Sequence, residues 1–105
     1  MELSDLELHD ARLLATHFDV VAQVADIRIA YYPSTTERNR MHGVLRFTGV
    51  RHFNQLADSA ALAAHASFGN ISHWVTGETP GMTYIYLARG MIVIEAAAVV
   101  LLADS

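Results

Sequence analysis

The chain has 105 residues, of which 52% are hydrophobic and 17% are charged, and its formal net charge is −4. This length suffices for one hydrophobic core, so we expect a single domain over residues 1–105. Cysteine and lysine are both absent, which excludes disulfides, thiolate metal sites and the chemistry of Schiff-base and P-loop lysines. The negative charge argues against nucleic acid as a partner, because such binding depends on neutralising phosphates.

Both ends of the chain bear on its location. The first ten residues are acidic and lack the basic and apolar regions of a secretory signal. The uncharged run at residues 96–103 is much shorter than the roughly 20 apolar residues that a membrane-spanning helix needs. We therefore expect a cytoplasmic protein that has no membrane partner.

The first part of the chain predicts two successive strands. Residues 3–8 mix leucines with acidic residues and favour an irregular segment. Residues 11–18 have the composition of a strand, and a turn at residues 19–22 follows. Residues 26–31 then alternate apolar and polar side chains, which is the pattern of a half-exposed strand. Together these segments predict a meander.

The middle of the chain predicts a loop, a strand and a helix. Residues 33–42 are polar and begin with proline, which favours an exposed loop. Residues 44–50 predict a strand. Residues 54–68 are rich in alanine and predict one short helix, with Asp58 as its N-cap and Gly69 as its stop. A further strand over residues 54–68 is the alternative.

The last third of the chain predicts a strand and a closing hairpin. Residues 70–76 have strand composition, and residues 77–81 form a turn. Residues 82–89 and 91–102 then predict two long strands around a tight turn at Arg89 and Gly90, where glycine would supply a positive φ.

This turn fixes a register for the hairpin and therefore its two faces. The aliphatic face would place Leu87 opposite Ile92 and Ile85 opposite Ile94. The other face would place Tyr86 opposite Val93 and Tyr84 opposite Glu95. The first face is expected in the core, and the second carries phenols and a carboxylate.

These elements define a fold class. Five or six strands and one short helix predict a mainly β protein, in which an antiparallel sheet curls into a sandwich or a partly open barrel. An α+β arrangement, with the alanine-rich helix packed across the sheet, is the alternative.

No motif indicates a catalytic or metal site. The six histidines have neither HxH nor HExxH spacing, so we expect no metal and no cofactor. They are His9, His17, His42, His52, His65 and His73. The adjacent pair His9 and Asp10 could form an acid–base pair, but neighbours on a strand point to opposite faces, and Asp10 is better interpreted as a turn residue. Glycine motifs of hydrolases and nucleotide-binding proteins are also missing.

Two groups of residues are candidates for binding. The first is an aromatic surface with a carboxylate at its edge, formed if residues 70–76 pair beside residues 82–89. It comprises His73, Trp74, Tyr84, Tyr86 and Glu95. Ordinary cross-strand packing of the aromatic rings is the alternative interpretation.

The second group is a cluster of arginines in the middle of the chain. Arg38, Arg40 and Arg46, with Arg51 beyond them, could bind an anion or an acidic partner through paired hydrogen bonds. A solvated rim that balances the acidic N-terminus is the alternative.

Several short motifs resemble a group of small, uncharacterised bacterial β-rich proteins over most of the chain. The motifs are Leu8-His9-Asp10-Ala11, Leu45-Arg46-Phe47-Thr48-Gly49-Val50, Gly69-Asn70-Ile71 followed by Trp74, and Ile85-Tyr86-Leu87 with Gly90 and Ile92-Val93-Ile94. Some proteins of this style are similar to immunity proteins of polymorphic toxin systems, which bind and block a toxin without catalysis. The resemblance thus implies a β-rich fold and a protein partner.

These observations lead to three functional hypotheses. The first is a non-catalytic binding module of the bacterial cytoplasm, such as an immunity-like inhibitor, which could also form a homodimer. The second is a small-ligand-binding protein or enzyme with a cleft bordered by His73, Tyr84, Tyr86 and Glu95. The third is a structural subunit in which residues 91–102 pair across a symmetric interface.

Overall fold

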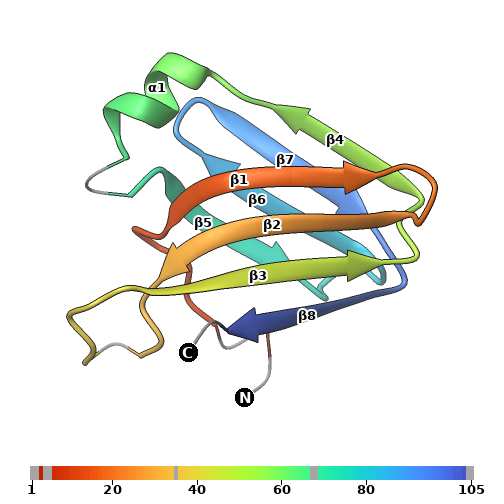
Figure 1. The fold of residues 1–105 in the computed structure, drawn as a ribbon, viewed down its shortest axis with the longest axis horizontal. Helices are drawn as coiled ribbons and strands as arrows, with labels where there is room; N and C mark the ends of the chain where they lie inside the picture. The colour runs from red at the N-terminus through yellow and green to blue at the C-terminus, as the bar shows by residue number, and fades with distance from the viewer. Residues whose placement is uncertain (1–2, 4–5, 35, 67–68, 104–105) are drawn as a thin grey trace.

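The computed structural model describes residues 3, 6–34, 36–66 and 69–103, and within them the chain forms eight strands and one helix. The strands make two four-stranded antiparallel sheets that lie face to face (Figure 1). The prediction of a mainly β fold with one short helix is confirmed, and the two sheets form a sandwich that does not close into a barrel.

The sheet nearer the viewer in Figure 1, here called the front sheet, has the strand order β1-β2-β3-β8. Its strands are β1 (Arg12–Asp19), β2 (Val24–Tyr31), β3 (Met41–Thr48) and β8 (Ala98–Ala103). The back sheet has the order β4-β7-β6-β5. Its strands are β4 (His52–Leu56), β5 (Ile71–Thr76), β6 (Met82–Leu87) and β7 (Gly90–Glu95). The helix α1 (Ser59–Ala64) follows β4. None of the described helical residues form a helix long and apolar enough to cross a membrane.

The core lies between the two sheets and follows the alternation of the strands. In the front sheet, Ile27 of β2 lies opposite Leu45 of β3, and both are fully buried. In the back sheet, Ile85 of β6 lies opposite Ile92 of β7, and both are fully buried as well. Side chains two residues apart on a strand point to the same face, so each sheet contributes one apolar face to a single core cluster.

The prediction for the first meander is confirmed, since β1 and β2 pair antiparallel. The buried side chain of Asn70 connects the start of β1 to the helix. Its side-chain oxygen accepts the N–H of Leu13 at 2.6 Å, and its side-chain NH2 group donates to the carbonyl of Leu62 at 3.1 Å. Leu8 comes from the irregular N-terminal segment and is fully buried in the core.

The predicted helix over residues 54–68 is wrong in its first part. Residues 52–56 form β4, which pairs along β7, because an available strand edge outweighs a modest local helix preference. The helix begins after Asp58, whose carboxylate accepts the N–H of Ala61 at 2.9 Å, so the predicted N-cap is confirmed. The helix ends at Ala64, well before Gly69, and residues 67–68 of the predicted helix lie outside the described residues.

The closing hairpin has the predicted faces but a different turn. Its two turn residues are Ala88 and Arg89, and Gly90 pairs with Leu87. Arg89 adopts the positive φ, at 56°, whereas Gly90 is needed because a Cβ at this position would collide with the carbonyl group of Leu56. The register is therefore shifted by two residues, an even number that leaves every side chain on its predicted face.

The single strand predicted over residues 91–102 is also wrong. It is divided between β7 in the back sheet and β8 in the front sheet, with the crossing at Ala96 and Ala97. The Ala96 N–H donates to the Gly81 carbonyl of the back sheet at 2.9 Å, and the Ala97 N–H donates to the Thr48 and Gly49 carbonyls at 3.0 and 3.2 Å. Consecutive residues thus bond to opposite sheets, which links the two layers directly.

Candidate functional site

The outer face of the back sheet carries most of the predicted aromatic surface. Side chains two residues apart on a strand share a face, so the residues that alternate with Ile85 on β6 and with Ile92 on β7, and their partners on β4 and β5, lie on the side away from the core. We call this surface the tyrosine face. It comprises His52, Asn54 and Leu56 of β4, His73 and Val75 of β5, Met82, Tyr84 and Tyr86 of β6, and Met91, Val93 and Glu95 of β7.

Two tyrosines occupy the middle of the tyrosine face. Tyr86 lies between His73 and Met91, and its ring stacks on the imidazole of His73 with centroids 4.4 Å apart and planes at 11°. Tyr84 lies between Val75 and Val93. Both phenols are half-buried, so each ring is supported by its neighbours on the sheet while part of it remains accessible.

Trp74 does not lie on the tyrosine face. A bulge between Ile71 and His73 interrupts the pairing of β5 with β6, so that Ser72 and His73 are both exposed and Trp74 turns inward. Its side chain is 8% exposed, and the indole N–H donates to the carbonyl of Leu6 at 2.8 Å. Trp74 therefore anchors the N-terminal segment to the core.

Glu95 lies at one corner of the tyrosine face. It pairs with Met82 and His52, and not with Tyr84 as the predicted register required. Its carboxylate is 3.6 Å from Nε2 of His52, and the glutamate side chain is 34% exposed. The structure thus brings together His73, Tyr84 and Tyr86 on one surface, with Glu95 at its border.

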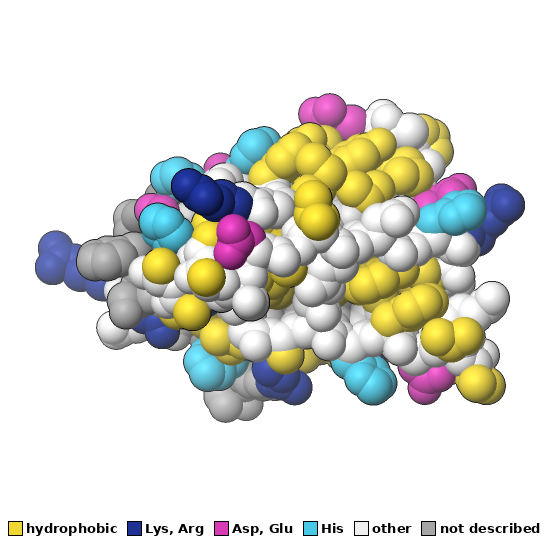
Figure 2. All heavy atoms as spheres, turned by 90° about the horizontal axis from the view of Figure 1, so that it is seen from above, with side chains coloured by type: hydrophobic (Ala, Val, Ile, Leu, Met, Phe, Trp, Pro, Cys, Tyr) yellow, Lys and Arg dark blue, Asp and Glu magenta, His cyan; other side chains and the backbone are white. Residues whose placement is uncertain are grey.

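No described helix or strand packs on the tyrosine face. The front sheet covers the opposite face of the back sheet, and no described helix or strand lies behind the back sheet in Figure 1. Leu56, at the edge of this face, is 74% exposed. Figure 2 views the molecule from the side of α1 and β4, and its largest hydrophobic area lies along the upper margin, on the side of the back sheet.

The predicted arginine group does not converge on one site. Arg40 lies over the ring of Tyr32, at 4.8 Å from its centroid, and donates from Nε and Nη2 to the Asp10 carbonyl at 3.3 and 3.0 Å. Arg38 lies in the same loop and is exposed. Arg46 is on β3, where its guanidinium is already bound by a carboxylate.

That carboxylate belongs to Asp26 on the outer face of the front sheet. Arg46 donates from Nε and Nη2 to its two oxygens at 2.9 and 3.0 Å. These hydrogen bonds hold the pKa of Asp26 below its usual value, with smaller contributions from the positive charge of Arg46 and of neighbouring His17 and Arg28. This paired geometry makes Arg46 part of the sheet surface rather than an open anion site.

His9 and Asp10 are in contact, contrary to the argument from strand geometry. They belong to a turn in which Asp10 has a φ of 65°, and Nε2 of His9 is 3.5 Å from the Asp10 carboxylate. The interpretation of Asp10 as a turn residue is confirmed. The hydrogen bond from His9 Nδ1 to the Ser72 carbonyl, at 2.9 Å, together with the charge of Asp10, raises the pKa of His9. Both side chains are more than half exposed, so the pair lies on the surface.

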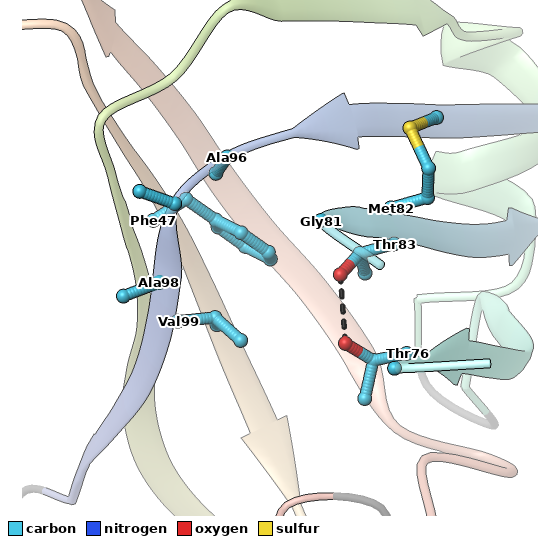
Figure 3. Close-up of a pocket in the computed structure, with 10 residues that line it drawn as sticks. Phe47, Thr76, Gly81, Met82, Thr83, Ala96, Ala98 and Val99 are labelled. Carbon is cyan, nitrogen blue, oxygen red and sulfur yellow. Dashed lines mark hydrogen bonds between the residues drawn. The ribbon is translucent and has the colours of Figure 1, made fainter. Parts of the chain in front are cut away.

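A pocket lies between the sheets where the chain crosses from β7 to β8 (Figure 3). It has a volume of about 220 Å³, and its lining includes Phe47 and Val99 of the front sheet. The hydroxyls of Thr76 and Thr83, 2.8 Å apart, bond to each other on the opposite wall (Figure 3). None of the described lining residues is charged or a histidine, so these side chains offer no group suited to proton transfer near neutral pH.

Among the described residues, no group of three or more histidine or acidic side chains is placed to hold a metal ion. No protein-family model matches the chain, and no curated protein or solved structure is significantly similar to it.

Proposed function

We propose that this chain is a non-catalytic binding module of the bacterial cytoplasm that docks another protein on the tyrosine face. The observation that carries the proposal is the uncovered row of Tyr84 and Tyr86 on the outer face of the back sheet, beside Met91 and Val93. A sheet face that only meets solvent usually carries polar side chains at these positions.

The side chains of this face suit a protein interface. Tyrosine and methionine are enriched at the centres of such interfaces, where a ring loses little conformational entropy and a phenol can still form hydrogen bonds. Tyr86 is already held by its stack on His73, so its orientation is set before a partner arrives. Strands on both sides of β6 give the face a rigid support.

The polar groups around the tyrosine face indicate which charge the partner's surface carries. Glu95 and the imidazoles of His52 and His73 border the apolar centre, and the chain as a whole has a net charge of −4. We expect a partner that presents aliphatic side chains surrounded by basic ones, because complementary charge steers association. The resemblance to immunity proteins gives the proposal its concrete form, an inhibitor of a toxin encoded beside this chain.

The experiment combines a growth assay with a binding measurement. The protein encoded beside this chain is expressed in a bacterial host, alone and together with the chain, and binding of the purified pair is measured by calorimetry. We expect co-expression to restore growth that the neighbour-encoded protein arrests. The double substitution Tyr84→Ala and Tyr86→Ala is expected to weaken binding by about 30-fold or more and to abolish the rescue.

Tyr32→Ala is the matched control. Tyr32 is a half-buried tyrosine that follows β2 at the end of the other sheet, so the same truncation there should leave binding and rescue unchanged. Near-ultraviolet circular dichroism checks that each variant keeps its fold. Wild-type affinity in the Tyr84 and Tyr86 double variant, or a neighbour-encoded protein that the chain neither binds nor neutralises, contradicts the proposal.

A further inference from the structure

We infer that the free edge of β8 pairs antiparallel with the β8 of a second copy of this chain, which joins two front sheets into one eight-stranded sheet. The inference concerns a different sheet from the tyrosine face and does not depend on the proposed function. It rests on the backbone pattern of β8, on its side chains and on the register that a two-fold axis allows.

The backbone of β8 has an unused row of hydrogen-bonding groups. β8 is an edge strand whose partner is β3. The Ala97 N–H reaches the Gly49 carbonyl, and hydrogen-bonded pairs alternate along an antiparallel ladder. The N–H and C=O groups of Val99 and Leu101 therefore face β3, whereas those of Ala98, Val100 and Leu102 face away from it. Among the described residues, no backbone hydrogen bond outside the ladders reaches these three residues.

The side chains of β8 do not protect this edge. All six residues, AVVLLA, are uncharged, and Val100 and Leu102 are 48% and 41% exposed. Proteins normally guard a free edge with charges, prolines, bulges or short strands. A regular, apolar edge strand is a template for pairing with another strand.

The other three edges of the two sheets carry such protection. β1 contains a bulge between Leu13 and Ala15 and ends in a charged residue, Asp19. β5 contains the bulge between Ile71 and His73. β4 carries the polar side chains of His52, Asn54 and Gln55. Among the described edge strands, β8 is thus the one with neither a bulge nor a polar side chain.

The register centred on Val100 pairs the most backbone groups in a symmetric dimer. In an antiparallel pair related by a two-fold axis, one residue lies opposite itself. If that residue is Val100, Ala98 lies opposite the partner's Leu102, and the outward N–H and C=O groups of all three meet those of the other copy. On the outer face Val100 contacts its own copy, and on the inner face Val99 lies opposite the partner's Leu101. No polar side chain of β8 is buried by this arrangement.

The size of the contact sets its strength. Six residues on each side bury less than the roughly 1,200 Å² typical of stable complexes, so we expect a dissociation constant of about 10–100 µM. Sedimentation velocity from about 1 µM to about 0.5 mM should show a monomer–dimer equilibrium. In the concentrated sample the Val100 amide should exchange with solvent much more slowly than in the dilute one, whereas the Leu101 amide, already bonded to β3, should not change.

Val100→Pro tests the backbone pairing. Proline removes only an N–H that faces away from β3, a position at which edge strands tolerate it. We expect this variant to remain monomeric at every concentration with an unfolding midpoint near that of the wild type. Val100→Thr is the matched control, because threonine keeps both the β-branched shape and the N–H, and it should dimerise like the wild type.

A cysteine at the same position tests the register without proline. The chain has no cysteine of its own, so Val100→Cys introduces a single thiol that would lie opposite its copy. Neighbouring Cα atoms in such a pair are about 5.5 Å apart, within the range that a disulfide spans. Oxidation should yield a covalent dimer, whereas Thr48→Cys, an exposed position one strand away, should not.

Three results overturn the inference. One is a wild-type chain that stays monomeric at about 0.5 mM. Another is a Val100→Pro variant that dimerises with wild-type affinity. The third is a Val100→Cys variant that forms no more disulfide than the Thr48→Cys control. This cysteine test does not depend on whether the proline variant folds.

Discussion

The glycine that follows the closing hairpin turn has a packing role that can be tested by substitution. Gly90 pairs with Leu87, and its missing side chain allows the Leu56 carbonyl of β4 to approach. Gly90→Ala would place a methyl group into that backbone. Because a backbone cannot move aside as a flexible side chain does, β4 and β7 must separate locally. We expect a loss of about 2–3 kcal/mol in the free energy of unfolding.

Two further substitutions separate crowding from backbone conformation. If Gly90 were required for a positive φ, asparagine would replace it better than alanine, since asparagine tolerates that region. If Gly90 is required because space is lacking, Gly90→Asn should lower the free energy of unfolding at least as much as Gly90→Ala. Arg89 is the residue with the positive φ, at 56°. Arg89→Gly relieves strain of about 1 kcal/mol and adds a similar entropic cost, so its net effect should be within about 1 kcal/mol of zero.

The assay is urea unfolding followed by the fluorescence of Trp74, the only tryptophan of the chain. With the urea dependence usual for a domain of this size, Gly90→Ala should lower the midpoint by about 1–2 M. Circular dichroism provides a second probe of the same transition. A Gly90→Asn variant within about 0.5 kcal/mol of the wild type, combined with a strongly destabilised Gly90→Ala variant, would refute the argument from packing.

Two further substitutions test contacts on other parts of the chain. Because Arg46 holds the pKa of Asp26 below its usual 3.8, the ion pair stabilises the fold above about pH 4, and this contribution is lost as the pH falls through the folded pKa. Asp26→Asn should therefore lower the thermal midpoint more at about pH 7 than at about pH 2, and an equal deficit at both values would speak against the pair. Trp74→Phe leaves the Leu6 carbonyl without the indole donor and should cost about 1–3 kcal/mol, or about 5–15 °C in the thermal midpoint followed by circular dichroism. A change below about 2 °C would show that this hydrogen bond contributes little.

The alternation of side chains predicted much of the fold from the sequence. The strands around residues 26–31 and 82–87 were recognisable because apolar residues recur at every second position over one buried face. The strand around residues 11–18 was predicted from its composition, and none of the residues of β1 is fully buried. The faces of the closing hairpin were also correct, although its turn was not. An error of two residues in register preserves the face of every side chain, so face assignment is more robust than pairing.

The errors arise where long-range contacts outweigh local preference. Nothing in the run of alanines at residues 96–98 marks the crossing between sheets, because the signal is a pair of backbone hydrogen bonds to Gly81 and to Thr48 with Gly49. The strand at residues 52–56 forms because β7 offers its edge. Neither the crossing at residues 96–98 nor the pairing of β4 with β7 can be predicted from local composition.

The candidate surface was predicted in part. His73, Tyr84 and Tyr86 share one face because they follow the pleat of neighbouring strands. Trp74 differs because the bulge before it adds one residue to β5, and a bulge has no clear sequence signal here. The arginines at positions 38, 40 and 46 lie within nine residues of one another, but the first two belong to a loop and the third to a strand, so they do not form one site.

The tyrosine face depends on the pairing of β6 with β7, and proton NMR tests this pairing most directly. The Ala96 N–H bonds to the Gly81 carbonyl, so Tyr84 with Val93 and Tyr86 with Met91 are non-hydrogen-bonded pairs, whose Cα atoms lie about 4.5 Å apart. We expect strong nuclear Overhauser contacts between the Hα protons of each pair. A strong Hα contact between Ile85 and Ile94 instead would place the turn at Arg89 and Gly90 and would contradict the arrangement of the tyrosine face described above.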